Sequence, residues 1–162
     1  MEDQLDQAGL RAWEAFVFAH AAIVGRIERD LAHKGHISLT WYDVLAALSD
    51  APDHRLRLHE LAQEVVLSRS GLTRLLDRME SGGLIRREPS VDDRRGAFAV
   101  MTATGEATLL RTWPSYAEGI RRYFSDCLTE SEKQAIAKAL RRVRSNALTA
   151  PENTPVRRTN SS

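Results

Sequence analysis

Side chains that donate hydrogen bonds gather on one side of a short segment, residues 69–79. Its apolar residues recur at i, i+3, i+4 and i+7, a spacing that forms one stripe along a helix. The stripe comprises Leu72, Leu75, Leu76 and Met79. The opposite face carries Arg69, Ser70, Thr73, Arg74, Asp77 and Arg78. Guanidinium groups donate to guanine edges and phosphates, and hydroxyl groups donate to either, so this face has the chemistry for DNA contact. Most polar helix faces are simply solvated, so the face needs support from its surroundings.

A basic hairpin after the helix supplies that support. Residues 85–89 and 97–101 are short strand candidates, and the segment between them contains Asp93, Arg94 and Arg95. The two arginines could belong to a plain charged turn. Beside such a helix, however, a hairpin that ends in adjacent arginines reaches past the body of the domain as a wing. Helix and wing together indicate a DNA-binding surface.

Local signals delimit the helix and the one before it. Ser68 is a candidate N-cap, because its hydroxyl oxygen can accept from an amide of the first turn. Gly82 and Gly83 close the helix, since a C-terminal cap often requires a positive φ. Residues 58–65 form a shorter helix that precedes it. Asp77 would be repelled by phosphate, so we expect it to pair with an arginine of the helix or of the wing.

Two longer helices are expected before this pair. The first spans residues 10–33, where apolar side chains fall at helical spacing, and Gly35 is a plausible cap at its end. The second starts near residue 39 or 40 and stops before Pro52, because proline cannot continue a helix. Residues 1–9 are polar and acidic, and we expect them to be disordered.

Two more helices are expected after the wing. The first begins at Thr102 or Thr104, and Pro114 should kink it or break it for one turn. Thr129 and Glu132 form a capping box that opens the second. Residues 149–162 show no apolar period, so we expect a disordered tail.

Charge and composition bound the class of protein. The net charge of the 162 residues is +1, but residues 1–54 carry nine acidic and four basic side chains, whereas residues 55–95 carry nine arginines against seven acids. A local basic face within a near-neutral chain is compatible with DNA binding. No apolar run of about 18 residues and no charged-then-apolar leader is present, so we expect neither a membrane span nor export. The single cysteine, Cys127, fits a reducing cytoplasm.

The order of the helices and two stretches of sequence resemble the MarR family of winged helix-turn-helix transcription regulators. The stretches are ELAQEVVLSRSGLTRLLDRMESGGLIRR and DDRRGAFAVMTATG. The wing is the more specific match: Asp93-x-Arg95, followed after the second strand by Met101-Thr102-x-x-Gly105. The resemblance covers residues 10–148 as a single, mainly α domain with a small β-wing. Its parts are a winged helix-turn-helix over residues 39–105 and dimerisation helices over residues 10–34 and 103–148.

The resemblance implies a homodimer that binds a palindromic operator. Such a protein usually acts as a repressor, and small aromatic or phenolic ligands, organic acids or oxidants release it. The expected DNA contacts are Ser68, Arg69, Ser70, Thr73, Arg74, Arg78, Arg94 and Arg95. One wing arginine, for which we favour Arg94, would enter the minor groove, where negative potential is concentrated. Arg95 would brace the hairpin through Asp93. Val66 stands where the family commonly has a glycine.

Aromatic side chains on the flanking helices are candidates for an effector pocket. The set comprises Trp13, Phe16, Val17, His20, Trp41, Tyr42, Arg111 and Trp113. In this interpretation, His20 offers a polar contact to a phenol or carboxylate, and Arg111 and Trp113 close the pocket. The alternative, which we favour, is that an aromatic stripe at helical spacing belongs to the core or the dimer interface.

Other chemistry finds little support. His33 and His36 straddle a helix end without nearby cysteine or a carboxylate cluster, so we expect no metal and no cofactor. Cys127 follows a helix among apolar residues and is expected to be an inert buried thiol, with a redox sensor as the alternative. No catalytic set is present, so we expect no enzyme activity. A non-specific architectural DNA-binding protein is the remaining alternative function.

Overall fold

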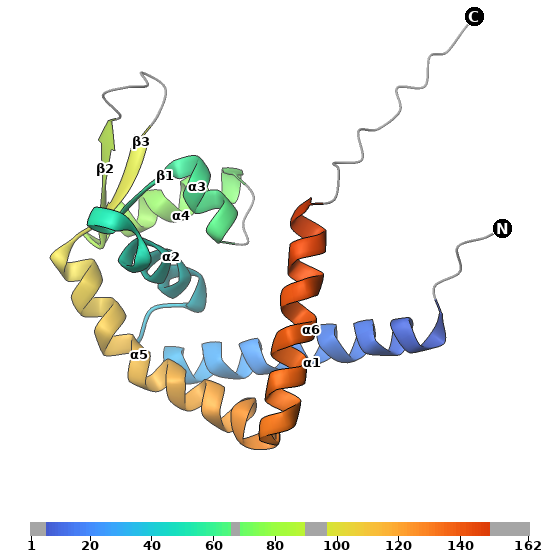
Figure 1. Ribbon diagram of the computed structural model, residues 1–162. Helices are drawn as coiled ribbons and strands as arrows, with labels where there is room; N and C mark the ends of the chain where they lie inside the picture. The colour runs from blue at the N-terminus through green and yellow to red at the C-terminus, as the bar shows by residue number, and fades with distance from the viewer. Residues whose placement is uncertain (1–5, 66–68, 90–96, 150–162) are drawn as a thin grey trace, which may run out of the picture. The chain divides into compact units, whose positions relative to one another are not determined.

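The computed structural model of the protein describes residues 6–65, 69–89 and 97–149 (Figure 1). The described chain is mostly helical and holds a small antiparallel sheet, which confirms the expected fold class. Some predictions lie outside the described residues: those for Val66, Ser68, Asp93, Arg94, Arg95 and the stretches 1–5 and 150–162.

Two compact units make up the chain, residues 1–124 and 125–162, where the sequence predicted a single domain over residues 10–148. The first unit holds α1 (Gln7–His33), α2 (Leu39–Asp50), the 3-10 turn η1 (Pro52–His54), β1 (Arg55–Arg57), α3 (Leu58–Glu64), α4 (Arg69–Ser81), β2 (Ile85–Pro89), β3 (Ala97–Met101) and α5 (Ala103–Tyr123). The second unit holds the 3-10 turn η2 (Ser125–Cys127) and α6 (Glu130–Thr149). No helix in the described part of the chain is both long and apolar enough to cross a membrane.

Helix α1 begins three residues earlier than the sequence predicted. The side chain of Asp6 accepts a hydrogen bond from the backbone N–H of Gly9 and caps the helix, so residues 7–9 are helical and the expectation of disorder there is wrong. Gly35 has a φ of 69° just beyond the end of α1, which confirms its role as a capping glycine. Ser38 caps α2 through the backbone N–H of Trp41.

The sheet has the strand order β1-β3-β2, with both pairs antiparallel. The sequence predicted β2 and β3 with the bounds that the structure has, but it missed β1. Asp53 and His54 adopt positive φ angles of 54° and 52°, and this turn brings the chain into β1. Three residues give no usable strand pattern by themselves, so β1 is recognisable only through its pairing with β3.

The main core lies between α2, α3, α4, α5 and the sheet. The predicted stripe of α4 is confirmed, because all four of its apolar side chains are buried. A second cluster joins the C-terminal half of α1 to α5 through Ile27, Leu31 and Leu39, with Ile23 and Ile120 packed against them. Helix α5 continues through Pro114, so of the two predicted alternatives, a kink or a one-turn break, the break is wrong: proline removes one backbone donor, and the helix absorbs that loss.

The second unit begins with η2 and continues into α6. Thr129 and Glu132 form the predicted capping box: Thr129 N donates to Glu132 Oε2 at 2.8 Å, and Glu132 N donates to Thr129 Oγ1 at 3.4 Å. Leu140 and Val143 on this helix are apolar but exposed in the described chain.

Candidate nucleic-acid interface

The exposed face of α4 carries the donors that the sequence predicted. Thr73, Arg74 and Arg78 are exposed, and the buried leucines and Met79 turn the opposite side of the helix into the core. Arg69 and Ser70 lie in the first turn of α4, but their side chains are outside the described part of the structure. Because the helix is anchored along its whole apolar stripe, its polar face is presented as a fixed surface.

Arg87 of β2 fixes α4 against the sheet. Its guanidinium lies 2.7 Å from Asp77 Oδ1 and 3.4 Å from Glu80 Oε2, and Nη2 also donates to the carbonyl of Thr73. Glu80 Oε1 in turn accepts from the backbone N–H of Arg87 at 2.9 Å. Asp77 therefore pairs with an arginine of a wing strand, one of the partners that the sequence predicted. Arg87 positions α4, the second helix of the helix-turn-helix and here called the recognition helix, and the sequence did not single this arginine out.

A second connection joins the end of α4 to the start of α5. Gly83, with a φ of 70°, ends α4. Thr102 Oγ1 donates to the carbonyls of Gly83 and Leu84 at 2.7 and 3.0 Å and accepts from Gly105 N at 3.0 Å. Gly105 is required here because a Cβ at this position would collide with the backbone carbonyl of Leu84. Thr102 and Gly105 belong to the segment that carried the family resemblance.

The predicted effector residues lie on three helices, α1, α2 and α5. Trp13, Phe16, Val17 and His20 are exposed on the N-terminal half of α1, where the rings of Trp13 and Phe16, and of Phe16 and His20, lie 6.2 Å apart. Arg111 is exposed on α5. The α1 residues therefore follow one another along a single helix.

Tyr42 and Trp113, two more of the predicted residues, lie between α2 and α5. Tyr42 is buried, and its ring lies 4.8 Å from the ring of Tyr116 and 6.4 Å from that of Trp113. Burial raises the pKa of both tyrosine hydroxyls. Trp113 remains half exposed, so one side of this cluster is open to a ligand or to another chain. Tyr116 was not among the predicted residues.

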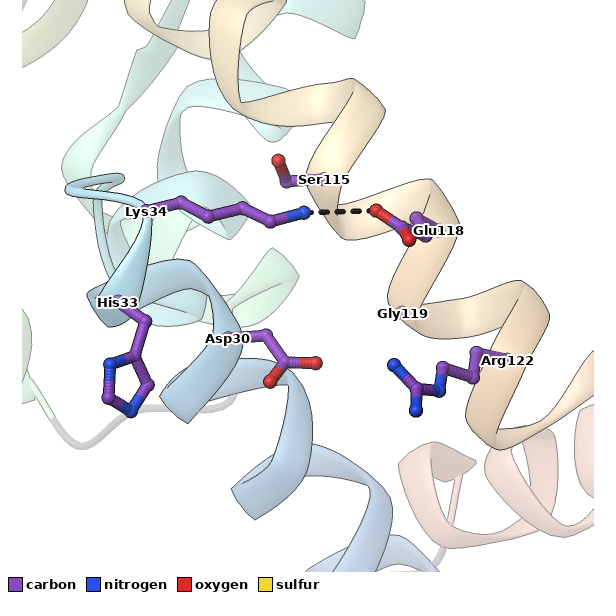
Figure 2. Close-up of a pocket in the computed structure, with 7 residues that line it drawn as sticks. All are labelled: Asp30, His33, Lys34, Ser115, Glu118, Gly119 and Arg122. Carbon is purple, nitrogen blue, oxygen red and sulfur yellow. Dashed lines mark hydrogen bonds and ion pairs between the residues drawn. The ribbon is translucent and has the colours of Figure 1, made fainter.

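Two cavities in the first unit could admit small molecules. One, of about 440 Å³, lies between the end of α1 and α5 (Figure 2) and is lined by Asp30, His33, Lys34, Ser115, Glu118, Gly119 and Arg122. Lys34 Nζ lies 2.9 Å from Glu118 Oε2, an ion pair that links the end of α1 to α5. The other, of about 370 Å³, lies between the start of α2 and α4, where Trp41, a predicted effector residue, faces Leu75 and Arg78.

The structure corrects the expectation for Cys127. This residue is exposed in η2, and the prediction of a buried thiol is wrong because the short turn before α6 leaves it at the surface. Within the described residues, no group of three histidine, cysteine, aspartate or glutamate side chains is placed to hold a metal ion.

The fold and the exposed face of α4 define a winged helix-turn-helix protein, and the comparisons identify its family. Residues 37–96 match the sequence model of the MarR family. MhqR, an HTH-type transcriptional regulator of Bacillus subtilis (strain 168), is 30% identical over 115 residues, which cover 71% of this chain and 77% of that protein. The chain belongs to the MarR family and is a DNA-binding transcriptional regulator.

Two further relatives bear on its function. The homoprotocatechuate degradative operon repressor of Escherichia coli is 27% identical over 134 residues, which cover 83% of this chain and 84% of that protein. The crystal structure of Sco3205, a MarR family transcriptional regulator from Streptomyces coelicolor in complex with DNA, is 28% identical, with a TM-score of 0.83 and 94% of each chain covered.

Proposed function

We propose that the protein is a homodimeric repressor that binds a palindromic operator and is released by a small aromatic or organic-acid effector. The exposed face of α4, fixed by its buried stripe and by Arg87, carries this proposal. The similarity to Sco3205, whose structure contains DNA, and to a degradative operon repressor supports it. DNA contacts would come from α4 and from the wing arginines Arg94 and Arg95.

Exposed apolar side chains support the dimer. Trp13, Phe16 and Val17 on α1, and Val143 and Leu148 on α6, are too exposed to stabilise a single chain. Apolar surface of this kind on separate helices typically marks an interface. A two-fold axis would place two recognition helices in successive major grooves, about 34 Å apart.

The effector would act by favouring a spacing of the two recognition helices that does not fit the operator. It must bind that form more tightly, because a ligand with equal affinity for both forms shifts nothing. The open aromatic cluster of Tyr42, Trp113 and Tyr116 suits a planar ring. In the dimer, Trp13 or His20 of the second copy could complete that site.

The first experiment tests operator recognition. An operator would be recovered by in-vitro selection from random duplexes, and its affinity compared with that of random DNA at physiological salt. We expect Arg74→Ala to weaken operator binding by about 1–3 kcal/mol and to relax specificity at one base position. Arg94→Ala should weaken binding severely while the dimer stays intact. Arg29→Ala, which removes an exposed arginine of α1, is the control.

Two outcomes would contradict the proposal. Equal affinity for operator and random DNA, with a steep salt dependence, would instead indicate an architectural DNA-binding protein. If neither Arg74→Ala nor Arg94→Ala changes the affinity for the operator, α4 and the wing do not contact DNA.

The second experiment tests release. A thermal-shift screen of aromatic acids, phenols and purines would identify ligands, and each ligand would then be tested for release of the operator. Because Cys127 is exposed, the same assay with peroxide tests redox sensing, the alternative mechanism. Release by peroxide that Cys127→Ser abolishes would favour that alternative.

A further inference from the structure

The outer face of the three-stranded sheet carries arginines that the recognition surface does not use. Strand pairing places Arg57, Phe98 and Glu88 in one row across β1, β3 and β2. Alternate residues of a strand share a face. The intervening row, Leu56, Ala99 and Arg87, faces the core and α4. The row of Phe98 therefore faces away from α4.

The next row on this outer face adds two more arginines. Arg55, Val100 and Arg86 lie opposite one another in register. Val100 is 5% exposed although it lies outside the core cluster. The aliphatic stems of its two arginine neighbours can cover it while their guanidinium groups stay in water. The side chains of Arg55 and Arg86 are 45% and 56% exposed.

The ring of Phe98 contacts the guanidinium groups of two of these arginines. The guanidinium carbons of Arg55 and Arg57 lie 4.5 and 4.9 Å from the centre of its ring. Cation–π attraction holds them there, although two like charges over one ring repel each other. An anion bound at this position would relieve that repulsion.

Glu88 is the one carboxylate within these two rows, and it contacts two of their three arginines. Glu88 lies 2.8 Å from Arg86 and 4.0 Å from Arg55. The described side chains of the two rows thus carry three positive charges and one negative charge. Arg55 and Arg86 are exposed, and Arg57 is half-buried. A positive surplus on ordered guanidinium groups that solvent can reach is an arrangement that recognises phosphate.

We propose that this outer sheet face, formed by Arg55, Arg57, Arg86 and Phe98, binds the phosphate backbone of DNA beyond the operator half-site. The inference rests on the proposed operator binding. β2 and β3 are the strands of the wing, and α4 packs on the inner side of β2, so the outer side of the same hairpin is open to DNA that would continue past the wing. Contacts there add affinity and extend the footprint without reading sequence.

The experiment compares two duplexes, one limited to the selected operator and one with about 10 further base pairs on each side, which is one helical turn. We expect the longer duplex to bind more tightly and with a steeper salt dependence. Arg55→Gln and Arg86→Gln should each lower the salt slope on the longer duplex by about 0.9, the value for one phosphate contact. Affinity for the shorter duplex should not change.

Two further variants separate charge from structure. Glu88→Gln should tighten binding to the longer duplex, because it removes the only negative charge of the two rows; a purely structural role for Glu88 predicts the opposite sign. Arg55→Lys should keep the salt slope. Arg29→Gln on α1 is the matched control for the loss of one exposed positive charge.

The outcomes distinguish the two proposals. Loss of binding to both duplexes by the wild-type protein would contradict the operator function itself. The sheet-face proposal alone would be overturned if operator binding is normal but the salt slope on the longer duplex is the same for wild type, Arg55→Gln and Arg86→Gln. That second result would direct attention to an acidic protein surface as the partner of this face.

Discussion

The two halves of α1 share one amphipathic pattern but lie in different surroundings. In the C-terminal half, Ile27 is 3% exposed and Leu31 is fully buried against α5 and the start of α2. In the N-terminal half, Trp13 is 61% and Phe16 is 43% exposed. The comparison teaches that helical spacing predicts an apolar face but does not identify what covers it. One half stabilises the fold of a chain, and we expect the other to stabilise a pair of chains.

Truncation in the buried half should have the largest effect. Leu31→Ala leaves a cavity between α1 and α5, and we expect the free energy of unfolding to fall by about 2–5 kcal/mol in urea titrations. Leu31→Met keeps most of the volume and should cost less than about 1.5 kcal/mol. Equal losses for the two variants would show that packing at this position is not what stabilises the helix.

Truncation in the exposed half should act on the dimer. We expect Trp13→Ala to raise the dimer dissociation constant by about 30-fold, the effect of an aromatic anchor that contributes 2 kcal/mol. The stability of the monomer should change by less than about 0.5 kcal/mol. Sedimentation equilibrium measures the first quantity. Phe18→Ala, off the stripe of Trp13, Phe16 and His20, is the control, and an unchanged constant for Trp13→Ala would contradict the interface.

The close approach of α1 to α5 offers a smaller, signed test. A Cβ at Gly119 would lie 2.9 Å from Cγ1 of Ile27, so Gly119→Ala should cost about 1–3 kcal/mol through overpacking. The better helix propensity of alanine offsets about 1 kcal/mol of that loss in the free energy of unfolding. In an Ile27→Ala background the clash disappears, and Gly119→Ala should become neutral or stabilising. A cost that is the same in both backgrounds would argue against this contact.

The ion pair that links the end of α1 to α5 should have the smallest effect. The hydrogen bond from Lys34, and then its charge, lower the pKa of Glu118 below its ordinary value of 4.5. A lowered pKa in the folded state stabilises the protein above that ordinary value, and the contribution is lost as pH falls through the folded-state pKa. The difference in thermal midpoint between wild type and Glu118→Gln should therefore be small at neutral pH and vanish in acid. A difference that grows in acid would contradict the sign.

Local signals predicted those parts of the fold that depend on near neighbours in sequence. The stripe of α4, the capping box at Thr129 and the positive φ at Gly35 and Gly83 each depend on residues within a few positions of one another. Helix α1 begins at Gln7, earlier than predicted, because the side chain of Asp6 caps it. The extent of β1 could not be predicted, because three residues become a strand only through pairing with β3.

Features of the site that join distant segments could not be read from local patterns. Arg87 meets Asp77 and Glu80 only because β2 packs beside α4, although two acids three positions apart on a helix are a signal that a search could use. The predicted effector set is divided for a related reason: Tyr42 and Trp113 pack together between α2 and α5, whereas Trp13 and its neighbours are exposed on the N-terminal half of α1. Spacing cannot supply that tertiary information.

The connection through Thr102 has a mechanical consequence. Its hydroxyl bonds the last turn before β2 to the first turn of α5, and the absence of a side chain at Gly105 lets the two backbones touch. We expect α5 to work as a lever whose short arm is the end of the recognition helix. A ligand bound along the rest of α5 would then tilt the recognition helix without contacting a residue that touches DNA. In the proposed regulator, the place where the effector binds would thus be separate from the place where DNA binds.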